Sequence, residues 1–146
     1  MVRFRIHTNW TNAVSRVAEW AAAKARIQEI LDDADAAGTR GVATRRRLRA
    51  RDLFVAFLER LRGFTVLDPA CGSGLYLALL ALKDLEHRVT LEAEAMGLHR
   101  EMPRIDPANV RGIEINPYAA ELARVSVWIG QTQWMLRTAS APASPS

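Results

Sequence analysis

The fold is decided by residues 64–75, which have the sequence FTVLDPACGSGL. Four apolar or β-branched residues open this stretch between Gly63 and Asp68-Pro69, and the pattern is typical of a short buried strand. The glycines after the strand permit a tight turn and let a ligand approach the backbone more closely than a Cβ would allow. A strongly apolar run follows at residues 75–83, where we expect a helix. The stretch therefore predicts a strand, a glycine-rich turn and a helix in succession.

A second strand and a further helix are expected later in the chain. Residues 110–114 have the sequence VRGIE, and Asn116-Pro117 then provide a capping residue followed by proline at the first helical position. We expect the last helix to run from there to about Arg137, and a weaker helical segment at residues 86–99. Strand, helix and second strand form one βαβ unit, whose strands lie parallel and are covered by helices. The predicted fold class is α/β, a truncated Rossmann-like fold with a short parallel sheet.

Two helices are predicted ahead of this unit, from about Trp10 to Ala36 and from about Thr44 to Arg62. Apolar residues recur at helical spacing in both helices. The first stripe consists of Val14, Val17, Ala21 and Ala25, extended by Ile27, Ile30 and Leu31, and the second of Leu48, Phe54, Phe57, Leu58 and Leu61.

The chain is expected to have three parts. Residues 1–62 form a helical segment, residues 63–137 form the α/β core, and residues 138–146 form a tail rich in Ala, Ser and Pro that is predicted to be disordered. In the last helix, one apolar face and a second stripe recur at helical spacing, and tryptophans on helical stripes are expected in the core. The face contains Tyr118, Leu122, Val125 and Ile129, the second stripe contains Trp128 and Met135, and the expected core tryptophans are Trp20, Trp128 and Trp134.

Composition limits the function classes. A chain of 146 residues fits one compact domain, and no apolar run approaches the roughly 20 residues that span a bilayer. The single cysteine, Cys71, fits a reducing compartment, so we expect a cytoplasmic protein without membrane contact. The three histidines and Cys71 show no metal-ligand spacing, and no metal site is predicted.

Arginine is concentrated in one short stretch. The net charge is +4, and 18 of the 20 basic residues are arginine. Six arginines lie within residues 40–51, and we interpret Arg45, Arg46, Arg47 and Arg49 as candidate contacts to nucleic-acid phosphates. The alternative is a solvated helix entrance without a nucleic-acid role, because no aromatic residue interleaves with these arginines.

The glycine-rich turn distinguishes between two nucleotide ligands. A dinucleotide site requires a third glycine where this chain has Leu77, and a pyrophosphate gains nothing from the carboxylate of Asp68 at the strand tip. S-adenosylmethionine carries a cationic methionine end and no phosphate, so Asp68 suits it. Glu114, at the tip of the second strand, is placed to accept hydrogen bonds from ribose hydroxyls, and Ile115 to pack on adenine. The structural alternative is that Asp68 only shapes a turn and Glu114 is an exposed strand-end charge.

These residues resemble a known family. Residues 66–74, VLDPACGSG, resemble motif I of DNA methyltransferases that modify adenine N6 or cytosine N4, and residues 112–123, GIEINPYAAELA, resemble the acidic-strand segment that follows it. The likeness is strongest to large bacterial restriction–modification enzymes in which methylase and nuclease are fused. It implies S-adenosylmethionine as cofactor and DNA as partner. The predicted cofactor site consists of Asp68, Pro69, Ala70, Cys71, Gly72, Gly74, Glu114 and Ile115.

Two features depart from that family. Leu75 stands where members often have asparagine, with Tyr76 at the aromatic position after it. The catalytic signature, Asn or Asp followed by Pro-Pro and an aromatic, has no counterpart, because the chain contains no Pro-Pro pair. We interpret Asn116-Pro117-Tyr118 as a helix cap, and no catalytic residue is predicted.

Three hypotheses follow. The chain is a fragment or subunit of a DNA adenine-N6 methyltransferase, a non-catalytic cofactor-binding module or gene remnant, or a small arginine-rich nucleic-acid-binding protein. Because a two-stranded sheet exposes both edges, we also expect self-association or a second polypeptide that supplies the rest of the sheet.

Overall fold

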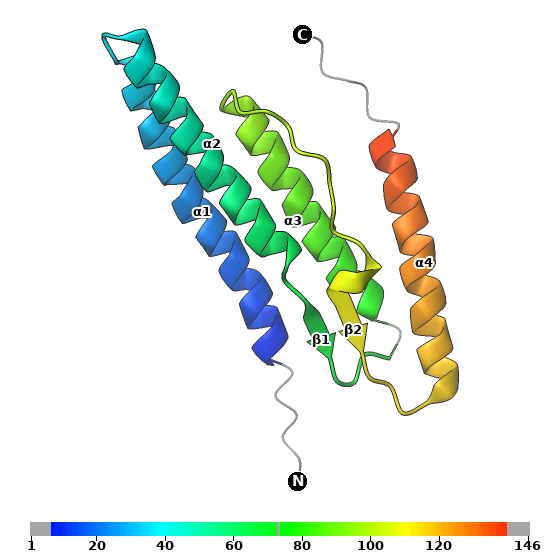
Figure 1. Cartoon of the computed structure of the whole chain (residues 1–146). Coiled ribbons are helices and arrows are strands. Elements are labelled where there is room, and N and C mark those ends of the chain that lie inside the picture. Colours follow the sequence, from blue (N-terminus) through cyan, green and yellow to red (C-terminus); the bar gives the residue numbers. More distant parts are fainter. Residues whose placement is uncertain (1–6, 73, 140–146) are drawn as a thin grey trace. The chain divides into compact units, whose positions relative to one another are not determined.

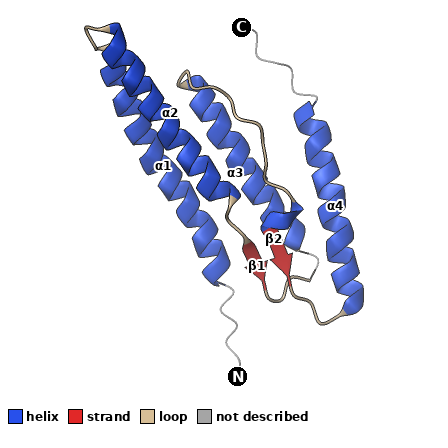
Figure 2. Ribbon diagram, viewed as in Figure 1, coloured by secondary structure: helices blue, strands red, loops and turns tan. Residues whose placement is uncertain are grey.

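The computed structural model describes residues 7–72 and 74–139, and only the backbone of residues 7–14 and 139. Over these residues the chain is an α/β structure in which four α-helices accompany two short strands (Figures 1 and 2). The elements in chain order are α1 (His7–Asp35), α2 (Arg40–Arg62), β1 (Val66–Asp68), α3 (Leu75–Ala95), the 3₁₀ turn η1 (Pro107–Asn109), β2 (Val110–Gly112) and α4 (Pro117–Ala139). Within the described ranges, no helix has both the length and the apolar character needed to cross a membrane.

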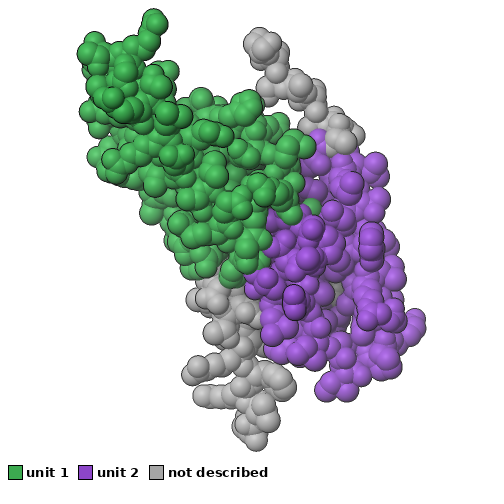
Figure 3. All heavy atoms as spheres, in the orientation of Figure 1, with its two compact units in different colours: residues 1–64, 83–104 green, residues 65–82, 105–146 purple. Residues whose placement is uncertain are grey.

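The chain forms two compact units, coloured separately in Figure 3. The first unit contains residues 1–64 and 83–104, and the second contains residues 65–82 and 105–146. Helix α3 belongs to both, since the division falls between Leu82 and Lys83.

The core of the first unit is built around Trp20. Helices α1 and α2 lie side by side. The centre of the Trp20 ring lies 5.1 Å from the centre of the Phe57 ring and 6.3 Å from that of the Phe54 ring. Leu58 and Leu61 continue the buried side of α2, as predicted. Three residues expected in the stripe of α1 are exposed instead, because its buried side runs through Trp20, Ile27, Ile30 and Ala34; the three are Val17, Ala21 and Ala25. Leu48, expected in the stripe of α2, is exposed as well.

Buried polar contacts connect the elements of this unit. The carboxylate of Glu86, 1% exposed, accepts a hydrogen bond of 2.8 Å from Arg62 Nε and bonds of 3.0 and 3.1 Å from the backbone N–H of Arg104. Trp20 Nε1 donates to Glu92 on α3 at 2.8 Å. These contacts join α1 and α2 to the second half of α3 and to the loop after it.

One continuous helix replaces two predicted ones. The segment expected at residues 75–83 and residues 86–95 of the segment expected at 86–99 are both part of α3, because neither glycine nor proline interrupts residues 75–95. Residues 96–99 lie beyond the end of the helix, where the prediction was wrong. The helix stops where Gly97 adopts φ +81° and Leu98 N–H donates to the carbonyl of Ala93 at 3.0 Å, a glycine-terminated helix end. The chain between the two strands therefore consists of the glycine-rich turn, α3, a loop and the 3₁₀ turn η1.

The second unit holds the sheet. β1 and β2 pair in parallel, with Val66 opposite Val110 and Asp68 opposite Gly112. Both strands are three residues long, shorter than predicted and displaced at their ends, since β1 begins at Val66 rather than Phe64 and β2 ends at Gly112 rather than Glu114.

Helix α4 buries a different side from the one its apolar pattern emphasised. Ala123, Val127 and Trp134 are buried, whereas Trp128 is 70% exposed, so the expectation that Trp128 lies in the core is wrong. The helix also extends two residues past Arg137, through Ala139, and residues 140–146, the rest of the predicted tail, lie outside the described residues.

Candidate cofactor site

Hydrogen bonds fix the turn after β1 against the end of β2. Ile113 N–H donates to the carbonyl of Asp68 at 2.8 Å, and Cys71 N–H donates to the carbonyl of Ile113 at 3.2 Å. The Asp68 carboxylate accepts a hydrogen bond of 3.1 Å from Ala70 N–H, a local turn that aspartate favours. The sheet register thus continues beyond the strands, and the residues after both strand tips lie side by side.

Glu114 bridges the turn and the chain after β2. One carboxylate oxygen accepts Gly72 N–H at 2.9 Å, and the other accepts Asn116 N–H at 2.9 Å. These backbone donors lower the pKa of Glu114, with the Asn116 bond the larger cause and the Gly72 bond the next. Because each carboxylate oxygen has about two acceptor positions, one on each oxygen remains for further donors. Glu114 is therefore ionised at neutral pH and retains hydrogen-bonding capacity.

Two glycines of this region have steric reasons to be glycine. Gly72 adopts φ +49°, a left-handed conformation that favours glycine. A Cβ at Gly112 would lie 2.5 Å from Cys71 Sγ and 3.0 Å from Cys71 Cβ, so the turn can pack against β2 only because Gly112 has no side chain. Gly74 N–H then donates to the carbonyl of Cys71 at 2.8 Å, immediately before α3 begins.

A pocket of about 480 Å³ lies at this junction. Ligand pockets commonly occupy about 300–1,000 Å³, so the volume suits a small organic molecule. Its walls come from the turn, the first residue of α3, the end of β2 with the two residues after it, and the first two turns of α4, and combine one carboxylate and one guanidinium with apolar groups. The lining residues are Cys71, Leu75, Gly112, Ile113, Glu114, Ala120, Ala123 and Arg124.

The structure brings together only part of the predicted site. Cys71 and Glu114 line the pocket, and Gly72 bonds Glu114 beside it. Asp68 shapes the turn but does not line the pocket. Ile115 is 96% exposed, next to Glu114 along the chain. The other predicted members, Pro69, Ala70 and Gly74, are exposed residues of the turn.

Six of the eight residues that line the pocket were not predicted as site residues, and they include Gly112 and Arg124. Gly112 lies between Arg111 and Ile113 and shows no local turn signal, although a glycine within a strand can mark a close backbone approach. Arg124 follows Ala120 by one helical turn on α4, so only the position of that helix beside β2 places it here.

Comparison with known proteins identifies the family. The model of the MmeI DNA-methyltransferase domain matches residues 43–144, well over half of the chain. The chain belongs to this family. The matched range begins in α2 and includes β1, the glycine-rich turn, β2 and α4, so it contains the whole pocket.

Two curated relatives are consistent with the MmeI-type assignment. A protein of Methanocaldococcus jannaschii, whose name describes a type II restriction enzyme and methyltransferase, is 36% identical over 77 residues, which is 51% of this chain. The protein named DNA methyltransferase A of Bacillus subtilis is 31% identical over 80 residues, which is 52% of this chain. The chain spans only 6% and 9% of the lengths of these two relatives. No solved structure matches the chain significantly.

Cys71 is buried in the wall of this pocket. Burial raises the pKa of its thiol, and the carboxylates of Asp68 and Glu114 raise it further. The thiol therefore stays protonated at neutral pH, so Cys71 acts here as a small packing residue opposite Gly112 rather than as a nucleophile.

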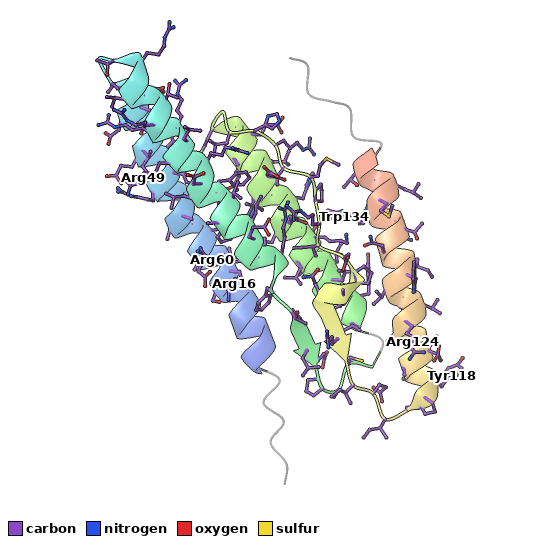
Figure 4. The ribbon with its side chains drawn as sticks, viewed as in Figure 1. Arg16, Arg49, Arg60, Tyr118, Arg124 and Trp134 are labelled. Carbon is purple, nitrogen blue, oxygen red and sulfur yellow. The ribbon has the colours of Figure 1, made fainter. Side chains whose placement is uncertain are left out.

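Half of the predicted nucleic-acid residues make contacts within the protein. Arg46 donates to the carbonyl of Asp33 at 2.6 Å, and Arg47 pairs with Asp35 at 2.7 Å, so both secure the α1–α2 connection. Arg45 and Arg49 are exposed on one side of α2, and Arg49 is labelled in Figure 4. A phosphate-binding role for the four arginines remains a prediction. In the parts of the chain that the structure describes, no group of three or more His, Cys, Asp or Glu side chains could hold a metal ion.

Proposed function

We propose that this chain forms the S-adenosylmethionine-binding part of a restriction–modification DNA methyltransferase that acts on adenine N6. Membership in the MmeI methyltransferase family supports the reaction class, and the parallel β1–α3–β2 arrangement supports a truncated Rossmann-like fold. When bound, S-adenosylmethionine supplies the methyl group from its sulfonium, and the chain's own residues hold and orient the molecule.

One observation carries the proposal: Glu114 is held at the edge of the pocket beside the glycine-rich turn. Its ionised carboxylate would accept hydrogen bonds from the ribose hydroxyls at its remaining acceptor positions. The exposed Ile115 would pack on the adenine ring. The turn that Asp68 shapes would face the cationic methionine end, and the Asp68 carboxylate would act on it through water.

The loop that holds the target base would come from polypeptide outside the given sequence. Asn116 Oδ1 accepts Tyr118 N–H at 2.9 Å and Ala119 N–H at 3.4 Å, and α4 begins at Pro117, as predicted for a helix cap. Asn116 is thus engaged in capping and is not free to hold a target amine. An adenine that leaves the DNA duplex would meet a catalytic loop that this sequence does not contain.

Calorimetric titration with S-adenosylmethionine tests the proposal. Glu114→Gln should weaken binding by about tenfold or more, because hydrogen bonds to a charged acceptor are replaced by weaker ones. Asp84→Asn is the matched control, since Asp84 is an exposed acid on α3 outside the pocket. Circular dichroism would confirm that both variants fold. Equal affinities for all three proteins, or no binding by the wild type, would refute the cofactor proposal.

A further inference from the structure

The exposed arginines of α2 differ from those of the other helices. Arg16 and Arg26 on α1 and Arg124 on α4 each pair with a glutamate three residues away, at distances of 2.5 to 2.8 Å. Local pairs of this kind balance the charges on a solvent-facing helix. Helix α2 contains eight arginines but only one aspartate and one glutamate. Its surface therefore carries an excess of positive charge that its own acidic residues cannot neutralise.

Three of these arginines lie along one side of α2. Successive residues of an α-helix are about 100° apart, which places Arg45, Arg49 and Arg60 within an arc of about 60° and along about 22 Å of the helix axis. All three are exposed, and we call them the arginine stripe. Phe54 and Leu58 lie on the opposite side of the helix, in the core. Figure 4 labels Arg49 and Arg60, two members of the stripe.

The guanidinium groups of the arginine stripe are available to an external acceptor. Among the residues that the structure describes, no hydrogen bond or ion pair engages Arg45 or Arg49. The guanidinium of Arg60 lies 5.9 Å from the centre of the Phe57 ring, a contact that leaves its N–H donors unused. Like charges four residues apart, such as those of Arg45 and Arg49, destabilise a helix. The stripe therefore opposes folding slightly and gains no internal partner in return.

Two carboxylates of α2 lie beside the stripe. Glu59 is engaged by Arg62 at 3.2 Å and by Arg104 at 3.1 Å, so its charge is already neutralised. Asp52 is exposed and stands three residues after Arg49, and it is the one acid of α2 that is left to oppose the three positive charges. An excess of positive charge remains along the stripe, which suits a polyanion.

We propose that the arginine stripe binds the phosphate backbone of duplex DNA. The planar guanidinium fork matches phosphate oxygens, and arginine is favoured over lysine wherever such two-point contacts matter. Each strand of a duplex presents one phosphate per about 3.4 Å of helix axis, so a stripe of this length can meet several phosphates. Contacts of this kind hold and orient the duplex without reading its sequence.

The inference alters the set of residues that the sequence predicted. Arg46 and Arg47 contact the end of α1, so only Arg45 and Arg49 of the four predicted arginines remain, and Arg60 joins them. The stripe belongs to the first unit, whereas the residues of the cofactor pocket belong to the second. The choice of DNA as the polyanion rests on the proposed function, but binding by the stripe involves no cofactor. DNA binding can therefore fail while S-adenosylmethionine still binds, and the reverse.

The salt dependence of DNA binding tests the proposal. Fluorescence anisotropy would measure the affinity of the chain for a duplex of about 20 base pairs and mixed sequence, without cofactor, from roughly 50 to 200 mM salt. Each phosphate contact adds about 0.9 to the steepness of log K against log salt concentration. The stripe variant, Arg45→Gln with Arg49→Gln and Arg60→Gln, should therefore reduce this slope by about 2.7 and weaken binding about tenfold or more at the middle of the range.

A matched control removes the same charge elsewhere in the first unit. It changes three arginines that are about half exposed and pair with glutamates: Arg26→Gln, Arg88→Gln and Arg100→Gln. The control should keep most of the slope and affinity of the wild type, because its arginines are already engaged. Thermal denaturation followed by circular dichroism should give the stripe variant a melting temperature no lower than that of the wild type, since the variant loses repulsion and no internal contact.

Several results would overturn the proposal. These are no binding of the duplex by the wild type at the lowest salt concentration, equal slopes for the wild type and the stripe variant, and an equal loss in the control. A melting temperature that falls by several degrees in the stripe variant would show that these arginines serve the fold instead. Tighter binding of a single-stranded RNA of the same length would make RNA the partner, and the proposal would be wrong.

Discussion

The contact between Tyr76 and Gly130 makes a sharp test of how the second unit is packed. A Cβ added at Gly130 on α4 would lie 1.9, 2.1 and 2.9 Å from three ring atoms of Tyr76 at the start of α3. Ordinary carbon contacts are about 3.5–4.0 Å, so in Gly130→Ala the ring would have to retreat by roughly 1.6–2 Å. An adjoining pocket of about 400 Å³, lined partly by Tyr76, gives the ring space to move.

The magnitude follows from two opposing effects. Overpacking of a core lowers the free energy of unfolding by about 1–3 kcal/mol, and the severity of this overlap points to the upper end of that range. Alanine in place of a helical glycine stabilises the helix by about 0.8–1.0 kcal/mol. We therefore expect Gly130→Ala to lower the free energy of unfolding by about 1–2 kcal/mol and the melting temperature by about 3–6 °C. Thermal and urea denaturation followed by circular dichroism would measure both.

Two companion variants isolate the steric cause. Gly41→Ala, in α2, meets nothing within 4 Å and should stabilise the protein by a few tenths to about 1 kcal/mol. In a Tyr76→Ala background, Gly130→Ala should also become stabilising, because its obstacle is gone. If Gly130→Ala stabilises the wild type as much as Gly41→Ala does, the close packing of α3 and α4 is not as described.

Three further outcomes are expected. Because the folded pKa of Glu114 is lowered, its stabilising contribution is complete above its unfolded pKa of about 4.3 and is lost only as the pH falls through the lower folded value. Urea denaturation should then show a constant stability difference between wild type and Glu114→Gln from pH 8 to about 5.5; a difference that shrinks around neutral pH would contradict the assigned hydrogen bonds. Cys71 should react with iodoacetamide at pH 7.5 much more slowly than free glutathione, and urea should abolish the difference, since burial raises its pKa; fast modification in the native state would show that the turn is open. Arg62→Met should lower the free energy of unfolding by about 3–5 kcal/mol, because it removes the guanidinium that pairs with the buried Glu86 carboxylate, and an unchanged melting temperature would contradict that pairing.

Local chemistry explains what the sequence predicted well. The order of strand, glycine-rich turn, helix, strand and helix follows from short apolar runs, glycines and the Asn116-Pro117 cap, all of which act within a few residues. The ends of the elements differ from the predicted ones. The strand ends moved by two residues, and two predicted helices are one, because continuous pairing or helical hydrogen bonding, rather than composition, sets such limits.

The choice of buried side depended on tertiary structure. The sequence indicates that α4 carries apolar residues at helical spacing, but Trp128 and Trp134 are equally apolar and only one of them is buried. Packing against neighbouring elements selects the side, and a pattern within the helix contains no information about those neighbours. The same reason accounts for the exposed Val17 and Leu48.

The sequence by itself determined that an aspartate, a glycine-rich turn and a second acidic strand tip occur in an order typical of a cofactor site. The tertiary structure alone decided that Gly72 N–H meets the Glu114 carboxylate, 42 positions away, and that Gly112 makes room for Cys71. These contacts depend on the register of β1 against β2, which arises only when distant segments pair. Residue types and spacing can therefore suggest a ligand, whereas the shape that would receive it is fixed by pairing between segments far apart in the chain.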